Sequence, residues 1–271
     1  MNPRKLAIVS AWIGPLQDFA LFAEENHRKY AVRHNYDYVL YKNVKSINSI
    51  ETDPPAFRVG WFMPEAILET LDAGYEYVFW MDMDSYFTNL NTSLEDLVKL
   101  DRSLVFTGDQ NDICNGGHLL FRNTTWSKEF LLRWSGLSSI RNGNLRTSHV
   151  NQVNQPGCQI ALVALLGNWS VNQDNFKFSF DRVNGWSGNI DRTNRNFGKY
   201  FAPVSRRNIE RILELIDPLV RDEIAIVEWR RLNAYHKSIR PPRGGVWRRG
   251  DPILHLIANS KEFFRDIPIA E

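Results

Sequence analysis

Residues 77–84, with the sequence YVFWMDMD, decide the fold that we predict for this chain. The first five are aromatic, β-branched or large apolar residues, as in a strand that is buried on both faces. Asp82 and Asp84 follow it directly. Ligands of α/β sheets bind beyond the carboxyl ends of strands, and Mg²⁺ or Mn²⁺ takes oxygen ligands from protein and phosphate together. We therefore expect a divalent-cation site here, in preference to a loop whose aspartates only form turns.

The segments on either side of this strand alternate between strand and helix patterns. Short apolar runs predict strands, and apolar residues at helical spacing predict helices. The expected strands are 6–10, 36–41, 104–107 and 118–122, and the expected helices are 18–34, 64–73, 127–134, 160–166 and 205–231. Pro64 is expected in the first turn of its helix and Pro218 at a break, while 170–200 is expected to be irregular. Such alternation favours an α/β fold, with a mostly parallel sheet flanked by helices.

Composition limits the class of protein further. With 271 residues, 43% hydrophobic and 24% charged, the chain suits one large domain or two small ones, and we expect a single domain over 1–271. A formal net charge of +2 argues against a nucleic-acid partner. Cys114 and Cys158 are too few for a disulfide framework and are expected to be small buried residues. The sequence shows no signal peptide or membrane span, which predicts a soluble, cytoplasmic protein.

The remaining metal ligand is expected near the C-terminus. Residues 250–255, GDPILH, predict a tight turn, a short apolar strand and then His255. Its imidazole could complete the coordination of the two aspartates, and Lys261 could reach a phosphate as a point charge. The plainer alternative is a histidine that only satisfies its own hydrogen bonds.

A basic stretch precedes this turn. From 229 to 250 the sequence has seven Arg or Lys and no acidic residue. Two interpretations stay open, a solvated loop or a cover over an anionic ligand such as a diphosphate.

These segments together resemble the retaining glycosyltransferases of the GT-A fold, most closely family 34, which includes xylosyl-, galactosyl- and mannosyltransferases. The resemblance rests on 26–31 (NHRKYA), 34–38 (HNYDY), 77–89 (YVFWMDMDSYFTN), 115–123 (NGGHLLFRN), the surroundings of Gln159, and 250–255. The segments occur in the family's order and span roughly residues 5 to 260.

The resemblance implies a metal-dependent transfer of a sugar, with xylose or galactose favoured, from a UDP-sugar to an oligosaccharide or glycan acceptor, with retention. It implies Mn²⁺ or Mg²⁺ on Asp82, Asp84 and His255. The residues implied in nucleotide-sugar binding are Ser10, Ala11, Trp12, Arg58, Asp82, Met83, Asp84, Gly116, Gly117 and Lys261. The residues implied in catalysis are Asn115, Gln159 and Lys261. The domain would then comprise a nucleotide-binding half, 1–110, and a donor-sugar and acceptor half, 111–271, with a C-terminal lid.

The chain departs from the family at three places. Gly157 and Cys158 stand where acidic residues usually precede the glutamine, so we expect a same-face reaction in which the leaving phosphate takes the acceptor's proton, without a carboxylate nucleophile. Phe62 replaces the lysine usual after the tryptophan, and the spacing from His255 to Lys261 is one residue longer. The family's Golgi anchor is also missing, so the Golgi lumen is expected only for a trimmed chain.

Three alternatives remain at this point. A haloacid-dehalogenase-type phosphatase also places a D-x-D after an apolar strand, but near the start of its fold. A glycan-binding protein on an inactive transferase fold would equally explain nine Trp and 13% aromatic residues. An inverting enzyme would need a general base such as Asp109 or Asp112.

One of three arginines could also stabilise the departing diphosphate together with Lys261. These are Arg243, Arg248 and Arg249.

Overall fold

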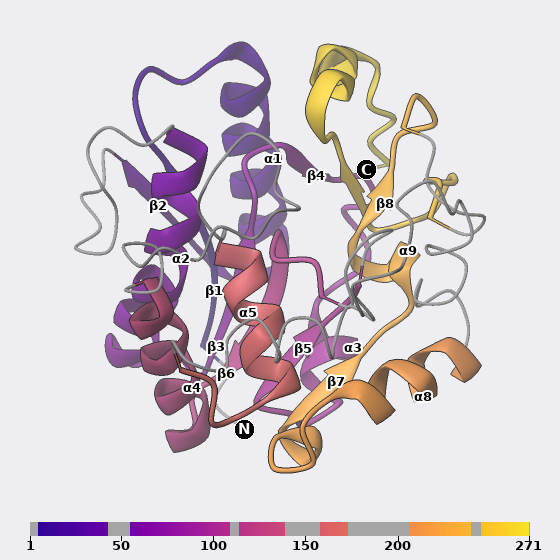
Figure 1. Cartoon of the computed structure of the whole chain (residues 1–271). Helices are drawn as coiled ribbons and strands as arrows, with labels where there is room; N and C mark the ends of the chain where they lie inside the picture. Colours follow the sequence, from indigo (N-terminus) through magenta and orange to yellow (C-terminus); the bar gives the residue numbers. More distant parts are fainter. Residues whose placement is uncertain are drawn as a thin grey trace.

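The computed structural model describes residues 5–42, 55–108, 114–138, 158–172, 206–239 and 245–270. These residues form a main sheet with helices on both faces and a smaller sheet beside it (Figure 1). Within the described ranges, no helix is both long and apolar enough to cross a membrane. The predicted division near residue 110 falls in 109–113, outside them.

The main sheet has six strands in the spatial order β2-β1-β3-β6-β5-β7. Its strands are β1 (Leu6–Trp12), β2 (Asp37–Lys42), β3 (Tyr77–Met81), β5 (Leu104–Phe106), β6 (His118–Arg122) and β7 (Ile224–Ile226). Strand β1 pairs in parallel with β2 and β3, and β5 pairs in parallel with β7. Strand β6 is antiparallel to both β3 and β5, so it alone runs against the others in this sheet. The predicted α/β class with a mostly parallel sheet is confirmed.

The smaller sheet joins distant parts of the chain. It consists of β4 (Ser85–Phe87), β9 (Ile253–His255) and β8 (Ala234–Tyr235), in the order β4-β9-β8. Strand β4 starts directly after the aspartate pair, and β9 is antiparallel to it. The smaller sheet therefore brings the C-terminal part of the chain to the end of β3.

Helices cover the main sheet according to the alternation of apolar residues in its strands. They are α1 (Asp18–His34), α2 (Pro55–Asp72), α3 (Glu95–Val98), α4 (Thr125–Gly136), α5 (Cys158–Gly167), α8 (Arg206–Leu215) and α9 (Trp229–Leu232), with 3₁₀ helices η2 (Arg221–Glu223) and η3 (Ala258–Asp266). Val78 and Trp80 of β3 face the cluster that contains α2, α4, α5 and α8, whereas Tyr77 and Phe79 face the cluster that contains α1 and α3.

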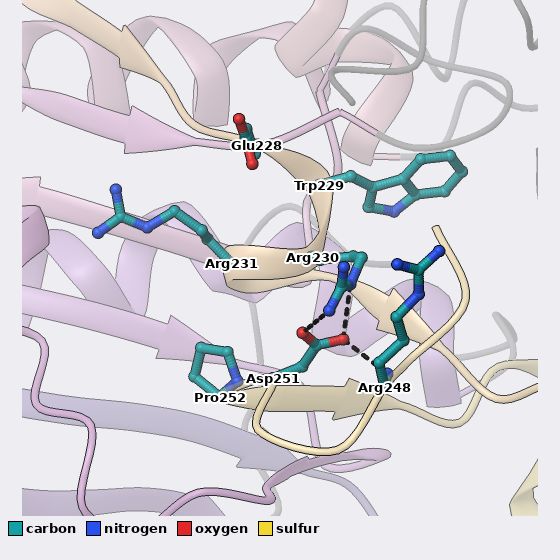
Figure 2. A pocket seen from close by; sticks show the side chains of 7 residues that line it. All are labelled: Glu228, Trp229, Arg230, Arg231, Arg248, Asp251 and Pro252. Atoms are coloured by element: carbon teal, nitrogen blue, oxygen red, sulfur yellow. Dashed lines mark hydrogen bonds and ion pairs between the residues drawn. The ribbon is translucent and has the colours of Figure 1, made fainter. Parts of the chain in front are cut away.

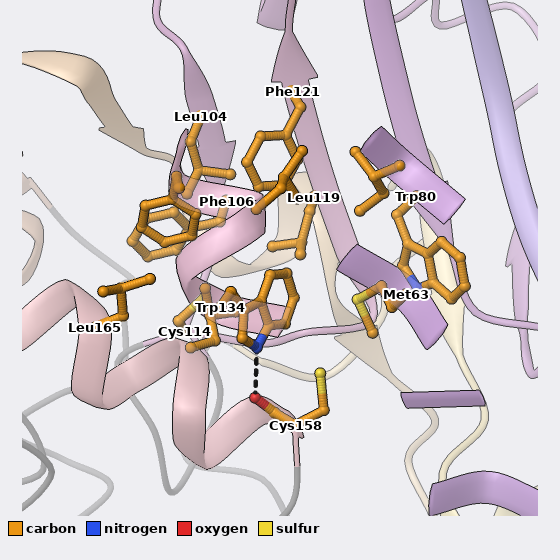
Figure 3. Close-up of a cluster of buried hydrophobic side chains, with 14 of the residues drawn as sticks. Met63, Trp80, Leu104, Phe106, Cys114, Leu119, Phe121, Trp134, Cys158 and Leu165 are labelled. Atoms are coloured by element: carbon orange, nitrogen blue, oxygen red, sulfur yellow. Dashed lines mark hydrogen bonds between the residues drawn. The ribbon is translucent and has the colours of Figure 1, made fainter. Parts of the chain in front are cut away.

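Both cysteines lie in the first of these clusters, as predicted. They are free and buried, and the Trp134 Nε1–H donates to the Cys158 carbonyl at 2.9 Å (Figure 3). The cysteines therefore contribute to packing.

The prediction for 64–73 is wrong at its start. Helix α2 begins at Pro55, and Pro64 lies inside it. An internal proline removes one helical hydrogen bond, which normally ends or kinks a helix. Here the helix buries Trp61, Ala66, Ile67 and Leu71 completely in the core, and this burial offsets the missing bond.

The prediction of helix over 205–231 with a break at Pro218 is confirmed for its first part and for the break, and it is wrong for 224–226. Helix α8 ends at Leu215, and 224–226 joins the main sheet as β7. The Asp217 carboxylate accepts from the Leu219 N–H at 2.9 Å, which forms a turn at Pro218. Ile224 and Ile226 are β-branched and bury against β5, so pairing in the sheet overrides the helical pattern. Of the stretch expected to be irregular, 173–200 lies outside the described residues.

Candidate functional site

Three predicted metal ligands meet at the carboxyl end of β3. Asp82 and Asp84 follow this strand, and the pairing of Ser85 with His255 between β4 and β9 brings the imidazole to them. One ligand atom from each of the three residues lies within 4.8 Å of the others. The two carboxylates are oxygen ligands of the kind that Mn²⁺ and Mg²⁺ prefer, and the imidazole offers one nitrogen ligand beside them.

Lys261 lies beside this cluster, on η3. Its Nζ is 2.9 Å from Asp84 Oδ2, and its side chain is 39% exposed. The ammonium group is therefore held at the site while it still reaches solvent, where an anion could meet it.

The charges within the cluster influence one another. Burial and the charge of Asp84 raise the pKa of Asp82. Burial alone would raise the pKa of Asp84, but His255 and Lys261 outweigh it and lower this pKa. Burial disfavours a charged imidazole, yet the Asp84 carboxylate raises the pKa of His255 above its ordinary value. The two carboxylates are thus unequal, and a further positive charge nearby would stabilise ionised Asp82.

A turn of small residues lies against the carboxylates. A Cβ on Gly117 would lie 2.8 Å from Asp82 Oδ2 and 3.2 Å from His255 Cε1, so the site leaves no room for a side chain there. Asn115 Oδ1 accepts from the Gly117 N–H at 2.9 Å. Gln159 Oε1 accepts from the Gly116 N–H, also at 2.9 Å. The structure thereby brings Asn115, Gly116, Gly117 and Gln159, which were predicted in nucleotide-sugar binding or catalysis, next to the metal cluster.

Four residues expected in nucleotide-sugar binding differ in their exposure, and the resemblance places three of them, Ser10, Ala11 and Trp12, at the nucleotide base. Ser10 is fully buried, and its hydroxyl donates to the Met81 carbonyl at 2.7 Å. Ala11 and Met83 are also buried, whereas Trp12 is half-buried and its Nε1–H donates to the Pro15 carbonyl. Of this set, Trp12 therefore has the side chain best placed to contact a base, and the roles of the others stay predictions.

Arg58 lies on α2 and is half-buried. Its Nε is buried and has no hydrogen-bond partner within the described part of the chain. Its predicted role in nucleotide-sugar binding stays a prediction.

The basic stretch is more ordered than a solvated loop over much of its length. It contains α9 and β8, and Trp229 is completely buried. Arg230 binds Asp251 through two contacts of 2.9 and 2.5 Å, and the Arg248 N–H donates to the same carboxylate at 2.7 Å (Figure 2). The residues that make these contacts lie in a pocket. It is lined by Glu228, Trp229, Arg230, Arg231, Arg248, Asp251 and Pro252. Whether the stretch covers an anionic ligand stays a prediction, and Arg243, Asp109 and Asp112 lie outside the described residues.

Sequence reasoning missed several residues that hold the site together. Asn233 Oδ1 lies 2.7 Å from His255 Nδ1, and the His118 and His255 rings meet edge to face at 5.1 Å. His27 Nε2 lies 2.8 Å from the Ser85 carbonyl oxygen, directly after the aspartate pair. The sequence carries no signal for these contacts, because each joins segments that only the fold brings together.

Comparisons with known proteins show what this chain is similar to. Residues 15–105, which include both aspartates, match the model of the galactosyl transferase GMA12/MNN10 family. A search of curated proteins finds no match. A solved glycosyltransferase involved in the glycosylation of the major capsid of PBCV-1 is 13% identical, with a TM-score of 0.57 over 97% of this chain and 100% of that one. The galactosyltransferase LgtC, solved with donor and acceptor sugar analogs, is 11% identical, with a TM-score of 0.44 over 97% and 95%.

Over residues 15–105 the chain is similar to a glycosyltransferase family, and its fold is similar to that of a solved glycosyltransferase. The resemblance to family 34 predicted from the sequence is confirmed by the match over 15–105. The same findings favour this class over a phosphatase of the haloacid-dehalogenase type.

Proposed function

We propose that this chain is a metal-dependent glycosyltransferase that transfers a sugar, with xylose or galactose favoured, from a UDP-sugar to a glycan acceptor with retention. The observation that carries the proposal is the convergence of Asp82, Asp84 and His255 at the end of β3. A cation held by these three residues would supply positive charge that stabilises the departing diphosphate.

Other residues of the site support the transfer by position and charge. Lys261, at 2.9 Å from Asp84, can turn from this carboxylate to an incoming diphosphate as a second positive charge. The absence of a side chain at Gly117 lets the backbone pass close to the cluster, because a Cβ there would lie 2.8 Å from Asp82 Oδ2. Asn115 and Gln159 lie beside this turn, where hydrogen bonds from the Gly117 and Gly116 N–H groups fix their side chains.

The same-face route is the one that these residues support. Gly157 and Cys158 precede Gln159, and neither supplies a carboxylate. Burial raises the pKa of the Cys158 thiol well above its usual range, so this group does not replace the missing nucleophile. In the proposed reaction the bond from the anomeric carbon to the diphosphate breaks. The acceptor oxygen then attacks from the same side, and its proton passes to the leaving phosphate.

The experiment that tests the proposal is nucleotide release from a panel of UDP- and GDP-sugars, with Mn²⁺ or with EDTA. We expect metal-dependent turnover of one UDP-sugar and its loss in Asp84→Asn. Asp96→Asn, which changes an exposed aspartate paired with Lys99, is the matched control and should behave as the wild type. If the wild type showed no turnover and bound no nucleotide, the proposal would be refuted. Metal-independent glycan binding would then support the glycan-binding alternative.

Stereochemistry has its own readout. NMR of the product should show the anomeric configuration of the donor, and mass spectrometry should find no glycosyl adduct on the protein. An adduct would refute the same-face route, and an inverted product would refute retention.

A further inference from the structure

Asn233 is a completely buried polar residue that contacts one member of the candidate metal cluster, His255. It lies between α9 and β8. Its Oδ1 is 2.7 Å from His255 Nδ1, on the side of the ring opposite Nε2, which is 3.1 Å from Asp84 Oδ1. The imidazole is thus held at both nitrogens, by an amide on one side and by a carboxylate on the other.

The chemistry of a histidine ligand explains why this contact matters. An imidazole binds a metal through a nitrogen without hydrogen, and its other nitrogen then carries one and needs an acceptor. Asn233 Oδ1 supplies an acceptor at Nδ1. The reversed amide would place its Nδ2–H against Nδ1 and force the hydrogen onto Nε2, which would block the ligand atom.

The amide nitrogen of Asn233 connects His255 to the turn formed by residues 115–117. Asn233 Nδ2 donates to the Tyr235 hydroxyl at 3.0 Å, and Asn115 Nδ2 approaches the same hydroxyl at 3.5 Å. Asn115 is itself oriented by the Gly117 N–H. A continuous polar network therefore runs from His255 to the turn.

Ring packing does not replace this contact. The rings of Tyr235 and His118 lie 5.6 and 5.1 Å from that of His255. Such packing sets the plane of the imidazole, but a ring flipped in this plane would present the wrong atom. A polar partner at Nδ1 distinguishes the two orientations.

We propose that Asn233 is a positioning residue that accepts the Nδ1 hydrogen of His255, aims Nε2 at Asp82 and Asp84, and couples this ligand to Asn115 through Tyr235. The inference rests on the proposed function, since it assumes that the cluster binds a cation.

The first test measures Mn²⁺ affinity without any sugar donor, from the electron paramagnetic resonance of free Mn²⁺. Loss of an outer partner of a histidine ligand weakens metal binding by about 10- to 100-fold, and we expect Asn233→Ala to fall in this range. Asn233→Asp keeps an acceptor and should stay within about threefold of the wild type. Asn91→Ala, at an exposed asparagine, is the matched control.

The second test observes the hydrogen bond itself. A ¹H–¹⁵N spectrum of the imidazoles, with and without Mg²⁺, should contain a protected Nδ1–H signal that disappears in His255→Gln. We expect this signal in the wild type and in Asn233→Asp, and its loss in Asn233→Ala.

The outcomes separate the inference from the function on which it rests. Wild-type Mn²⁺ affinity in a folded Asn233→Ala protein would overturn the inference and leave the metal site standing. A wild-type spectrum without the Nδ1–H signal would overturn it even if Asn233→Ala does not fold. A wild type that binds no Mn²⁺ would refute the metal site and the positioning role together.

Discussion

Substitution of Gly117 by alanine should disable the site and weaken the fold. The added Cβ would lie 2.8 Å from Asp82 Oδ2, which is 0.6 Å less than the 3.4 Å at which ordinary contact begins. Asn115 Oδ1 and His255 Cε1, at 3.0 and 3.2 Å, restrict any escape of the methyl group. Gly117 has no positive φ, so the cost arises from crowding and not from backbone strain.

The distance that Asp82 must move to make room for the methyl group sets the size of the expected loss of activity. Site side chains must stay within about 0.5 Å of their productive positions, and a shift of about 1 Å can cost about 100-fold in rate. We therefore expect Gly117→Ala to reduce metal-dependent turnover by about 10- to 100-fold. Overpacking of a tight site should destabilise the fold by about 1–3 kcal/mol.

The assay compares Mn²⁺ affinity, nucleotide release and melting temperature in two variants. Gly136→Ala is the control, because a Cβ at this last residue of α4 meets nothing within 4 Å. It should match the wild type in Mn²⁺ affinity and nucleotide release, and its melting temperature should equal or slightly exceed that of the wild type. Wild-type affinity and turnover in Gly117→Ala would refute the reasoning, since Asp82 could then move without consequence.

Three further predictions concern stability and reactivity. Burial lowers the pKa of His27 from 6.5 to about 4, so the unfolded chain binds one more proton between these values. The His27 contribution is then complete above pH 6.5, and stability should fall by about 1.4 kcal/mol per unit as the pH drops toward 4. Denaturant titrations at several pH values should show that the free energy of unfolding depends less steeply on pH in His27→Gln than in the wild type. An equal dependence on pH would contradict this assignment to His27. Asp251→Ala leaves Arg230 without its carboxylate and should cost about 1–3 kcal/mol, seen as a lower melting temperature; an unchanged melting temperature would contradict this role. Cys114 and Cys158 are buried and should react with a thiol reagent only after unfolding, whereas fast labelling of the native protein would refute their burial.

Local patterns predicted the elements that form the frame of the site. The bounds of α1, β3 and β6 agree with the expected ranges, because strong helical spacing and dense apolar runs specify them within one segment. Prediction failed where packing opposed a local rule. Pro64 lies inside α2 because the core holds that helix together, and 224–226 is a strand because β5 offers it a parallel partner.

The sequence by itself determined that two aspartates follow a buried strand, that a histidine ends a short strand near the C-terminus, and that the ordered segments resemble one family of enzymes. Only the tertiary structure decided that these groups meet. The contact depends on the pairing of Ser85 with His255, and residues so far apart in the chain come together only through sheet register and core packing. Asn233 shows the same limit, since a lone asparagine carries no pattern and gains its role from the 2.7 Å contact with an imidazole that the fold places beside it.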